Sequence, residues 1–325
     1  MITNLEAKSV ATLRRIFGVI SFVLAIVILF SEVELRAHPG KGERNEGSRG
    51  EKIGVLLVSH GSRSDAWRKS LLALEASVRE SLLSIQNVRT IKSAFMEYEG
   101  PSIATQLREF DAEGFTDIII IPVFLTVSPH SFDDIPTIIG KKEDPNSVQT
   151  LKVEQIERYT PRARTHITPL LDFSDMLRKN VLRRAKALSQ NAGEEGLVMI
   201  AYGDETYKRE WSELLSSVGE FVKQRSGILE YSFGWCGHLV HYDPQFTASA
   251  IEQVLAKRKK AIVIPVLVAP DEMFQVRIIG DGIAKVKENK TRVRYKPDSI
   301  LPDRNVESWI VQVTTEFATD IRTTR

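Results

Sequence analysis

The sequence predicts an α/β fold with two tandem domains, each a parallel sheet flanked by helices, and a cleft between the two. Two observations support this prediction. Apolar runs without alternation, the pattern of strands buried on both faces, are separated by segments whose apolar residues recur at helical spacing. The same pattern then occurs a second time, so that residues 51–192 and 193–325 form two similar halves. With 325 residues, 42% of them hydrophobic, the chain is long enough for two domains of ordinary size.

Residues 1–50 are expected to lie outside both domains. Within them, Ile16–Phe30 contains no charge, follows basic residues and is shorter than the ~20 residues that a membrane-spanning helix usually needs. These features are typical of a secretory signal peptide, removed after Ala37. Because Leu35 is not small, a retained N-terminal membrane anchor is the alternative, and a buried core helix is a third. The first two interpretations place the rest of the chain outside the cytoplasm, either exported to the periplasm or anchored, after a polar linker over residues 38–50.

The first half opens with an apolar run from Lys52 to Ser59, followed directly by His60. The run predicts a central strand, and Gly61 then opens the turn into a helix. The remaining elements alternate in the same way, which predicts a parallel sheet with helices on both faces. The predicted helices span residues 65–84, 102–113 and 172–190, and the further strands span residues 88–95, 117–125 and 166–171.

The second half repeats the order of the first, with the seam near Ala192. Tyr202 stands where His60 stands, and Met273 stands where His130 stands. We therefore expect a tandem duplication with one active site. The first repeat should provide its residues, and the second repeat should form the opposite side of the cleft. Residues 197–204 match 55–62, and residues 261–269 match 119–127. Near the end of each half, residues 295–297 match 167–169, and the last helix (306–317) matches the helix that follows 167–169.

His60 and His130 are the strongest candidates for chemistry. Each follows a predicted central strand, and the carboxyl ends of parallel strands meet at one edge of a sheet, where open α/β sheets bind their ligands. Two neutral imidazoles at that edge are suited to holding a divalent transition metal, and either can accept a proton near neutral pH. The alternative is that each histidine is a structural hydrogen-bonding residue.

The acidic residues near the two histidines also have structural alternatives to a functional role. Glu97 lies beside Glu99 in a predicted loop and can be a solvated acid. We expect Asp133 and Asp134 to cap the segment that follows them rather than to bind metal.

A second cluster lies in the second half, where Cys236, His238 and His241 fall within one short loop. Cysteine and histidine bind soft metals, so these residues could complete the site from the opposite wall. The alternative is a loop packed by Trp235 and Tyr242. Since Cys236 is the only cysteine, the chain has no intrachain disulfide and no Cys-x-x-Cys motif.

Several short motifs together resemble one known family. These motifs are His60-Gly61-Ser62-Arg63, Ala94-Phe95-Met96-Glu97 with Pro101-Ser102-Ile103, Pro122-Val123-Phe124-Leu125 leading to His130, and Asp134-Ile135-Pro136. With them the sequence is similar to the class II tetrapyrrole chelatases, which insert cobalt or iron into sirohydrochlorin and are named for the cobalamin-pathway enzyme CbiX. The resemblance covers most of residues 52–190 and, more weakly, the second repeat.

The resemblance implies two chelatase-like domains of the Rossmann or flavodoxin kind and a lyase of cobalamin or siroheme biosynthesis that uses no ATP. It carries His60 and His130 over as metal-binding and catalytic residues. Glu97 matches an acidic position near the same cleft and is expected to be catalytic by taking up a proton or completing the coordination of the metal. Arg63 is expected to pair with a substrate carboxylate, its alternative being a solvated residue at the helix start. One departure is the loop that precedes His130, which reads Val-Ser-Pro where the family usually has a glycine.

Composition and motifs exclude other classes. A formal net charge of +2, with acids and bases interspersed, provides no basic stripe for nucleic acid. No glycine-rich nucleotide fingerprint or Walker loop is present. The alternative to an enzyme is an exported protein that binds a metal or a tetrapyrrole without turnover. The sequence does not choose between Co²⁺ and Fe²⁺, and it does not fix the oligomeric state.

Overall fold

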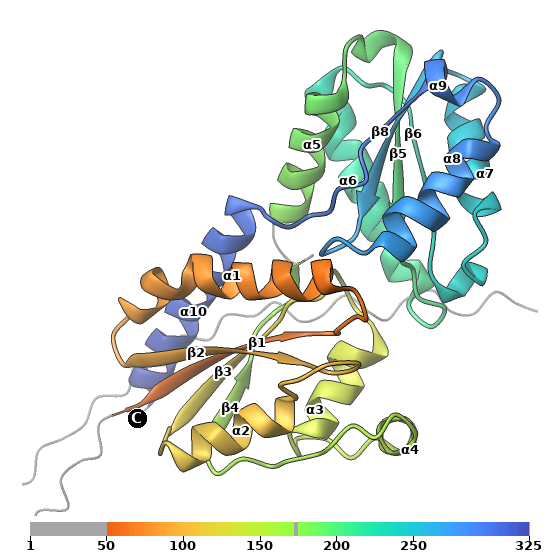
Figure 1. Ribbon diagram of the computed structural model, residues 1–325. Coiled ribbons are helices and arrows are strands. Elements are labelled where there is room, and N and C mark those ends of the chain that lie inside the picture. Colours follow the sequence, from red (N-terminus) through yellow and green to blue (C-terminus); the bar gives the residue numbers. More distant parts are fainter. Residues whose placement is uncertain (1–50, 172–174, 325) are drawn as a thin grey trace, which may run out of the picture. The chain divides into compact units, whose positions relative to one another are not determined.

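A computed structural model of the chain describes residues 51–171 and 175–324 and contains two four-stranded parallel sheets (Figure 1). Every strand pair in both sheets is parallel, and the central strands β1 and β5 are buried along their whole length. The predicted α/β class is confirmed. The first sheet has the order β2-β1-β3-β4, with β1 (Ile53–Ser59), β2 (Val88–Phe95), β3 (Asp117–Pro122) and β4 (Arg164–Ile167). The second has the order β6-β5-β7-β8, with β5 (Glu195–Ala201), β6 (Tyr231–Trp235), β7 (Lys260–Val266) and β8 (Val293–Tyr295).

Helices connect successive strands and cover both faces of each sheet. The helix α1 shows why: Leu71, Leu74, Val78 and Leu82 recur at helical spacing and are all buried. The helices are α1 (Asp65–Leu83), α2 (Ile103–Ala112), α3 (Ile135–Ile138), α4 (Pro145–Val153), α5 (Met176–Leu188), α6 (Lys208–Ser226), α7 (Gln245–Leu255), α8 (Gly280–Lys285), α9 (Asn289–Arg292) and α10 (Arg304–Thr323), with π-helical turns η1 (His130–Asp134) and η5 (Met273–Ile279).

Three strands end earlier than the sequence predicted, each near a proline. The strand expected over residues 117–125 stops at Pro122, and that expected over 261–269 stops at Val266, one residue after Pro265. The strand expected over 166–171 ends at Ile167, two residues before Pro169. Proline has no N–H to donate to the ladder, and each of these strands ends within two residues of one. The apolar residues beyond the strand ends remain buried.

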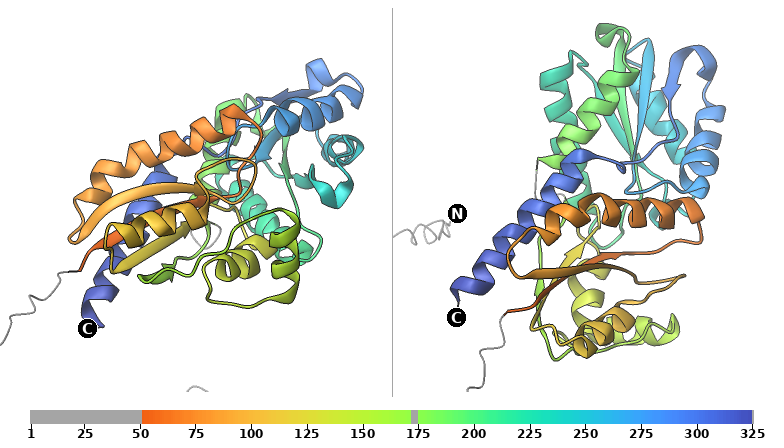
Figure 2. Two further views of the ribbon diagram at one scale, coloured as in Figure 1. Left: turned by 60° about the horizontal axis from the view of Figure 1, so that its bottom comes forward. Right: turned by 60° about the vertical axis from the view of Figure 1, so that its left-hand side comes forward.

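The last helix of each repeat packs on the other repeat's sheet. The helix α5 follows the first sheet in sequence but packs against α6 and β7, whereas α10 packs against α1 and β3. Figure 2 shows α10, in blue, running beside α1, in orange. One continuous apolar core therefore includes residues of α1, α5, α6 and α10.

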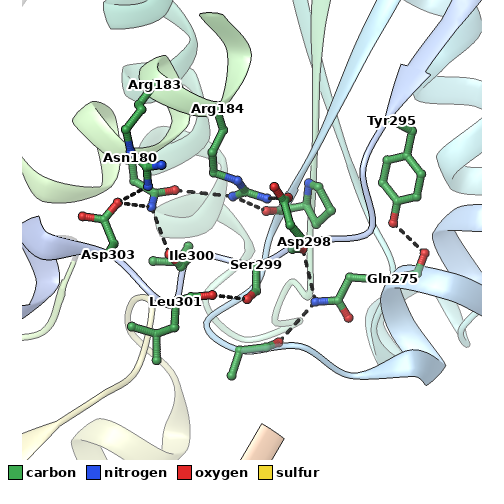
Figure 3. Close-up of polar contacts among 12 residues, drawn as sticks. Asn180, Arg183, Arg184, Gln275, Tyr295, Asp298, Ser299, Ile300, Leu301 and Asp303 are labelled. Carbon is green, nitrogen blue, oxygen red and sulfur yellow. Dashed lines mark hydrogen bonds and ion pairs between the residues drawn. The ribbon is translucent and has the colours of Figure 1, made fainter. Parts of the chain in front are cut away.

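A buried polar network fixes α5 to the second repeat (Figure 3). The guanidinium of Arg184 pairs with the carboxylate of Asp298 and donates a hydrogen bond of 2.8 Å to the carbonyl of Pro265. The side-chain amide of Asn180 donates to the Asp303 carboxylate over 2.7 Å. These contacts give partners to the side-chain amide of Asn180 and to the two terminal guanidinium nitrogens of Arg184, which α5 buries among apolar residues.

The predicted leader or anchor at Ile16–Phe30 lies outside the described residues, as do the first residues of the helix predicted over 172–190. Within residues 51–171 and 175–324, no helix combines the length and the apolar character needed to cross a membrane.

Candidate metal centre

His60 lies directly after β1, at the carboxyl edge of the first sheet. The next residue, Gly61, has a φ of +95°, and a Cβ atom there would lie only 2.1 Å from the carbonyl oxygen of Glu97. Glycine is therefore required for the two loops to approach each other. The N–H of Glu97 donates to the carbonyl of His60 over 2.9 Å, so the loop after β2 holds Glu97 beside His60.

His130 begins the π-helical turn η1, in the loop that follows β3. Its Nδ1 atom lies 2.8 Å from Oδ2 of Asp134, one turn further on, and the Asp134 side chain is only 6% exposed. Asp134 makes no side-chain cap to the helix that follows, so the predicted capping role is wrong for this residue. A buried carboxylate on Nδ1 instead fixes the orientation of the ring and leaves Nε2 available to a ligand.

Sequence reasoning missed the partnership of Asp134 with His130. The spacing of four residues was its signal, because residues four apart on a helical turn face each other. Burial by itself raises the pKa of the Asp134 carboxyl, but hydrogen bonds from His130 and Ser147 outweigh burial and bring that pKa below its ordinary value. The carboxyl therefore stays ionised near neutral pH and accepts the hydrogen bond of His130.

The structure brings His60, Glu97 and His130 together. One potential ligand atom from each lies within 4.8 Å of the others, and the two imidazole ring centroids are 4.7 Å apart. Nε2 of His60 is 3.9 Å from Oε1 of Glu97. In the described part of the chain this is the only group of three or more histidine, cysteine or acidic side chains close enough to hold a metal ion. Two imidazoles and a carboxylate suit Co²⁺, Fe²⁺ and Ni²⁺.

The environment keeps His60 in its metal-binding form. Burial lowers the pKa of His60, and the neighbouring His130 lowers it further, while Glu97 acts in the opposite direction. A neutral imidazole is the form that binds metal. The side chains of His60 and His130 are still 32% and 30% exposed, so a ligand can reach them from solvent.

Tyr98 and Arg63 lie at the rim of this site. The Tyr98 ring is 6.0 Å from the ring of His60, and the guanidinium of Arg63 stands 5.2 Å from the centroid of Tyr98. The Tyr98 side chain is exposed and also hydrogen-bonds the carboxylate of Glu97. Arg63 therefore contacts Tyr98, which itself contacts His60 and Glu97. Its role in binding a substrate carboxylate stays a prediction.

Comparison with known proteins shows which family the chain belongs to. The model of the CbiX family matches residues 54–188. The sirohydrochlorin cobaltochelatase of Methanococcoides burtonii is 36% identical over 97 residues, which cover 30% of this chain and 70% of that protein. The chain belongs to the CbiX family. The corresponding enzyme of Methanothermobacter thermautotrophicus is 36% identical over 89 residues, which cover 27% of this chain and 59% of that protein.

Solved structures share the fold of this CbiX-family chain over both repeats. The sirohydrochlorin chelatase SirB of Bacillus subtilis subspecies spizizenii, solved in complex with cobalt, superposes with a TM-score of 0.58 at 16% identity and covers 83% of this chain and 96% of its own. The multi-domain protein DR2241 of Deinococcus radiodurans gives the same TM-score of 0.58 at 13% identity, covering 82% of this chain and 55% of its own.

The second repeat of this CbiX-family chain keeps the loop geometry but has none of the three ligands. The backbone bond from Glu97 to His60 has its counterpart in a bond from Gly237 to the carbonyl of Tyr202, so Gly237 occupies the position of Glu97. Met273 begins η5 as His130 begins η1. The sequence had shown both histidine replacements but not the loss of the glutamate.

Of the two alternatives for Cys236, His238 and His241, the metal cluster does not form. Cys236 is fully buried, and burial raises the pKa of its thiol, which disfavours the metal-binding thiolate. The Nδ1 atom of His238 lies 3.2 Å from the hydroxyl of Tyr202. Over the described residues, neither these side chains nor His241 belongs to a group that could hold an ion.

Proposed function

We propose that this chain is a chelatase that inserts a divalent metal ion, Co²⁺ or Fe²⁺, into sirohydrochlorin or a related tetrapyrrole without ATP. The observation that carries the proposal is the convergence of His60, Glu97 and His130 at the carboxyl edge of the first sheet in a CbiX-family chain. Sheet edges of this kind are where open α/β proteins bind their ligands.

Both histidines are arranged to offer Nε2 to the metal substrate. Nδ1 of His60 lies 3.1 Å from the carbonyl of Gly61, and Nδ1 of His130 contacts Asp134. With each Nδ1 carrying the proton, the Nε2 lone pair is free to bind the ion. Three protein ligands leave coordination positions open, which a metal needs if its ligands are to be exchanged for ring nitrogens.

The same groups can take up the protons that insertion releases. A divalent ion replaces two N–H protons of the macrocycle, so two protons must leave as the metal enters. As the ion passes from the protein to the ring nitrogens, His60, His130 and Glu97 regain lone pairs and become bases next to the reacting atoms. The lowered pKa of His60 means that it does not keep its proton long near neutral pH, and it is ready for the next ion.

We assign the orientation of the substrate to Arg63 and Tyr98, at the rim of the site. Sirohydrochlorin-like rings carry many carboxylates, and the exposed guanidinium of Arg63 can bind one of them through two hydrogen bonds. The exposed ring of Tyr98, 6.0 Å from His60, offers a flat apolar surface beside the metal.

The proposal is tested by following the absorbance of sirohydrochlorin with purified protein and a panel of Co²⁺, Fe²⁺ and Ni²⁺. We expect His60→Ala and His130→Ala each to reduce the insertion rate at least ~100-fold, since each removes a ligand and a base. The matched control is His241→Asn, which changes a histidine outside the group and keeps its left-handed backbone (φ +52°) accessible. Full activity of both alanine variants would contradict the assignment.

The same absorbance assay distinguishes the chelatase from the alternative function, a protein that binds its ligand without turnover. A protein that binds metal or tetrapyrrole while the spectrum of the metallated ring never develops is a carrier without turnover. This alternative follows from the uncharged stretch Ile16–Phe30, because an exported or membrane-anchored protein would meet its ligands outside the cytoplasm. We propose that location for the two repeats, and fractionation of cells that express the full chain tests it.

A further inference from the structure

We propose that the second repeat, although it has lost its own ligands, positions both histidine loops of the first repeat through Asp271, Trp211 and Tyr207. The inference rests on the metal site of the proposed function and assigns new residues to it. Metal ligands must be held within ~0.5 Å of their productive positions, and that precision comes from the contacts of the supporting residues. The three residues named here provide such contacts.

The first contact holds the His60 loop. The hydroxyl of Ser62, two residues after His60, donates a hydrogen bond of 2.6 Å to Oδ2 of Asp271. Asp271 is buried, and its other carboxylate oxygen accepts from the N–H of Met273 over 3.0 Å. The carboxylate that ties down the His60 loop thus belongs to the loop that carries Met273 in place of a histidine.

The second contact holds the chain just before His130. The indole N–H of Trp211, on α6, donates a hydrogen bond of 3.0 Å to the carbonyl of Val127. Trp211 is itself buried, with its ring 6.3 Å from that of Trp235. This donor is therefore rigid, and the carbonyl that it binds lies three residues before His130.

The third contact lies just after His130. The ring of Phe132, in the π-helical turn η1, stacks on the ring of Tyr207 with centroids 6.2 Å apart and an angle of 28° between the planes. Tyr207 precedes α6, and its N–H donates to Asp204 over 2.9 Å. Contacts from the second repeat therefore lie on both sides of His130 and next to His60, whereas the ligand positions themselves lie in the first repeat.

These three contacts together fix the distance between the two imidazoles. Each histidine follows a different strand, and the loops that carry them are joined by the edge contact of their rings. Releasing either loop would allow the rings to separate, and the ion would lose one ligand. Metal affinity should therefore depend on second-repeat residues that touch neither the metal nor the macrocycle.

The test measures Co²⁺ binding by calorimetry and by the visible absorption of the bound ion, without tetrapyrrole. We expect Ser62→Ala and Asp271→Asn each to weaken Co²⁺ binding by roughly 10-fold, the lower end of the range for the partners of metal ligands. If the two residues act through their shared hydrogen bond, the double variant should bind Co²⁺ with the same affinity as the single variant that has the lower affinity. Ser62→Thr retains the hydroxyl, so its affinity for Co²⁺ should be close to that of the wild type.

A matched pair of tryptophan variants tests the second loop. Trp211→Phe keeps an aromatic ring in the core but removes the donor to Val127, and it should weaken Co²⁺ binding and change the absorption spectrum of the bound ion. Trp235→Phe makes the same change in the packing partner and should leave both unchanged. Thermal unfolding of each variant shows whether the fold is retained.

The outcomes are separable. Wild-type affinity in Ser62→Ala, Asp271→Asn and Trp211→Phe, in a protein that binds Co²⁺, would overturn the inference and leave the proposed function intact. A wild-type chain that binds no Co²⁺ would overturn the metal site and this inference with it. The Ser62→Ala variant removes a single half-buried loop hydroxyl, so it keeps the comparison decisive even if a core variant fails to fold.

Discussion

The two repeats share their backbone geometry and differ in the chemistry placed on it. Gly61 and Gly203 both adopt positive φ after the first strand of their sheet, and both repeats follow the third strand with a π-helical turn. At the ligand positions, however, the second repeat has Tyr202, Gly237 and Met273 in place of two imidazoles and a carboxylate. The comparison shows that the shape of these loops does not depend on metal ligands, so the ligands of the first repeat are a separate chemical feature.

The helices that cover the two sheets differ in the same way. The buried face of α10, on the first sheet, is apolar apart from one threonine. The buried face of α5, on the second sheet, includes Asn180 and Arg184, which must be satisfied by the second repeat. A polar network therefore joins α5 to the second repeat, whereas the contact of α10 with the first sheet is mainly apolar.

The largest effect should come from breaking that network. Asp298→Ala removes the carboxylate that pairs with Arg184, whose side chain is only 5% exposed. An unpaired buried charge lowers the free energy of unfolding by ~3 kcal/mol. Urea unfolding at neutral pH measures this, and Arg184→Met in the Asp298→Ala background should recover most of the loss because no charge then remains buried. Equal stability of Asp298→Ala and wild type would contradict the role given to the pair.

An effect of intermediate size is expected from substitutions in the two π-helical turns: a change in η1 should weaken Co²⁺ binding, and the matching change in η5 should not. Asp134→Leu removes the carboxylate that orients His130, and we expect Co²⁺ affinity to fall roughly 10- to 100-fold. Asp134→Asn keeps an acceptor for the Nδ1 proton and should recover part of the affinity.

The matched control lies in the second repeat. Arg277 stands four residues after Met273, as Asp134 stands four residues after His130, and its side chain is exposed. Arg277→Leu should therefore leave Co²⁺ binding unchanged. Calorimetric titration of the three variants side by side is the measurement, and equal losses in Asp134→Leu and Arg277→Leu would refute the assignment.

The smallest effect is a pH dependence of stability at Asp303. Burial alone raises the pKa of this carboxyl, but hydrogen bonds from Arg183, the backbone of Asn305 and Asn180 outweigh burial and lower it. The folded pKa then lies below the unfolded value of ~3.9, so the carboxylate stabilises the fold above that pH and loses its contribution as pH falls through the folded pKa.

Urea unfolding of wild type and Asp303→Asn over a pH series checks this expectation. The difference in their free energies of unfolding should be largest near neutral pH and should shrink as pH falls below ~4. A difference that stays constant across the series would show that ionisation of Asp303 contributes nothing.

Much of the fold and part of the site could be predicted from the sequence. Continuous apolar runs gave the strands, and the rule that parallel strands end at one edge brought His60 and His130 together. Asp134 was misassigned because its spacing of four residues from His130 brings the two side chains together only on a helical turn. The sequence did not predict that His130–Asp134 forms such a turn. The sequence left open whether Cys236 binds a metal or packs in a loop, because its burial depends on packing by residues distant in sequence.

The exchange of terminal helices could not be predicted either. Both α5 and α10 have an apolar stripe that fits the face of an α/β sheet, and periodicity does not say which of two similar sheets each will cover. Only the partners of Asn180 and Arg184, far along the chain, distinguish the two choices.

That exchange of helices has a consequence for how the molecule comes apart. A cut at the seam near Ala192 would leave each fragment holding the helix that belongs over the other fragment's strands. Neither half can complete its own core alone, so the duplicated halves should melt in a single cooperative step rather than one after the other.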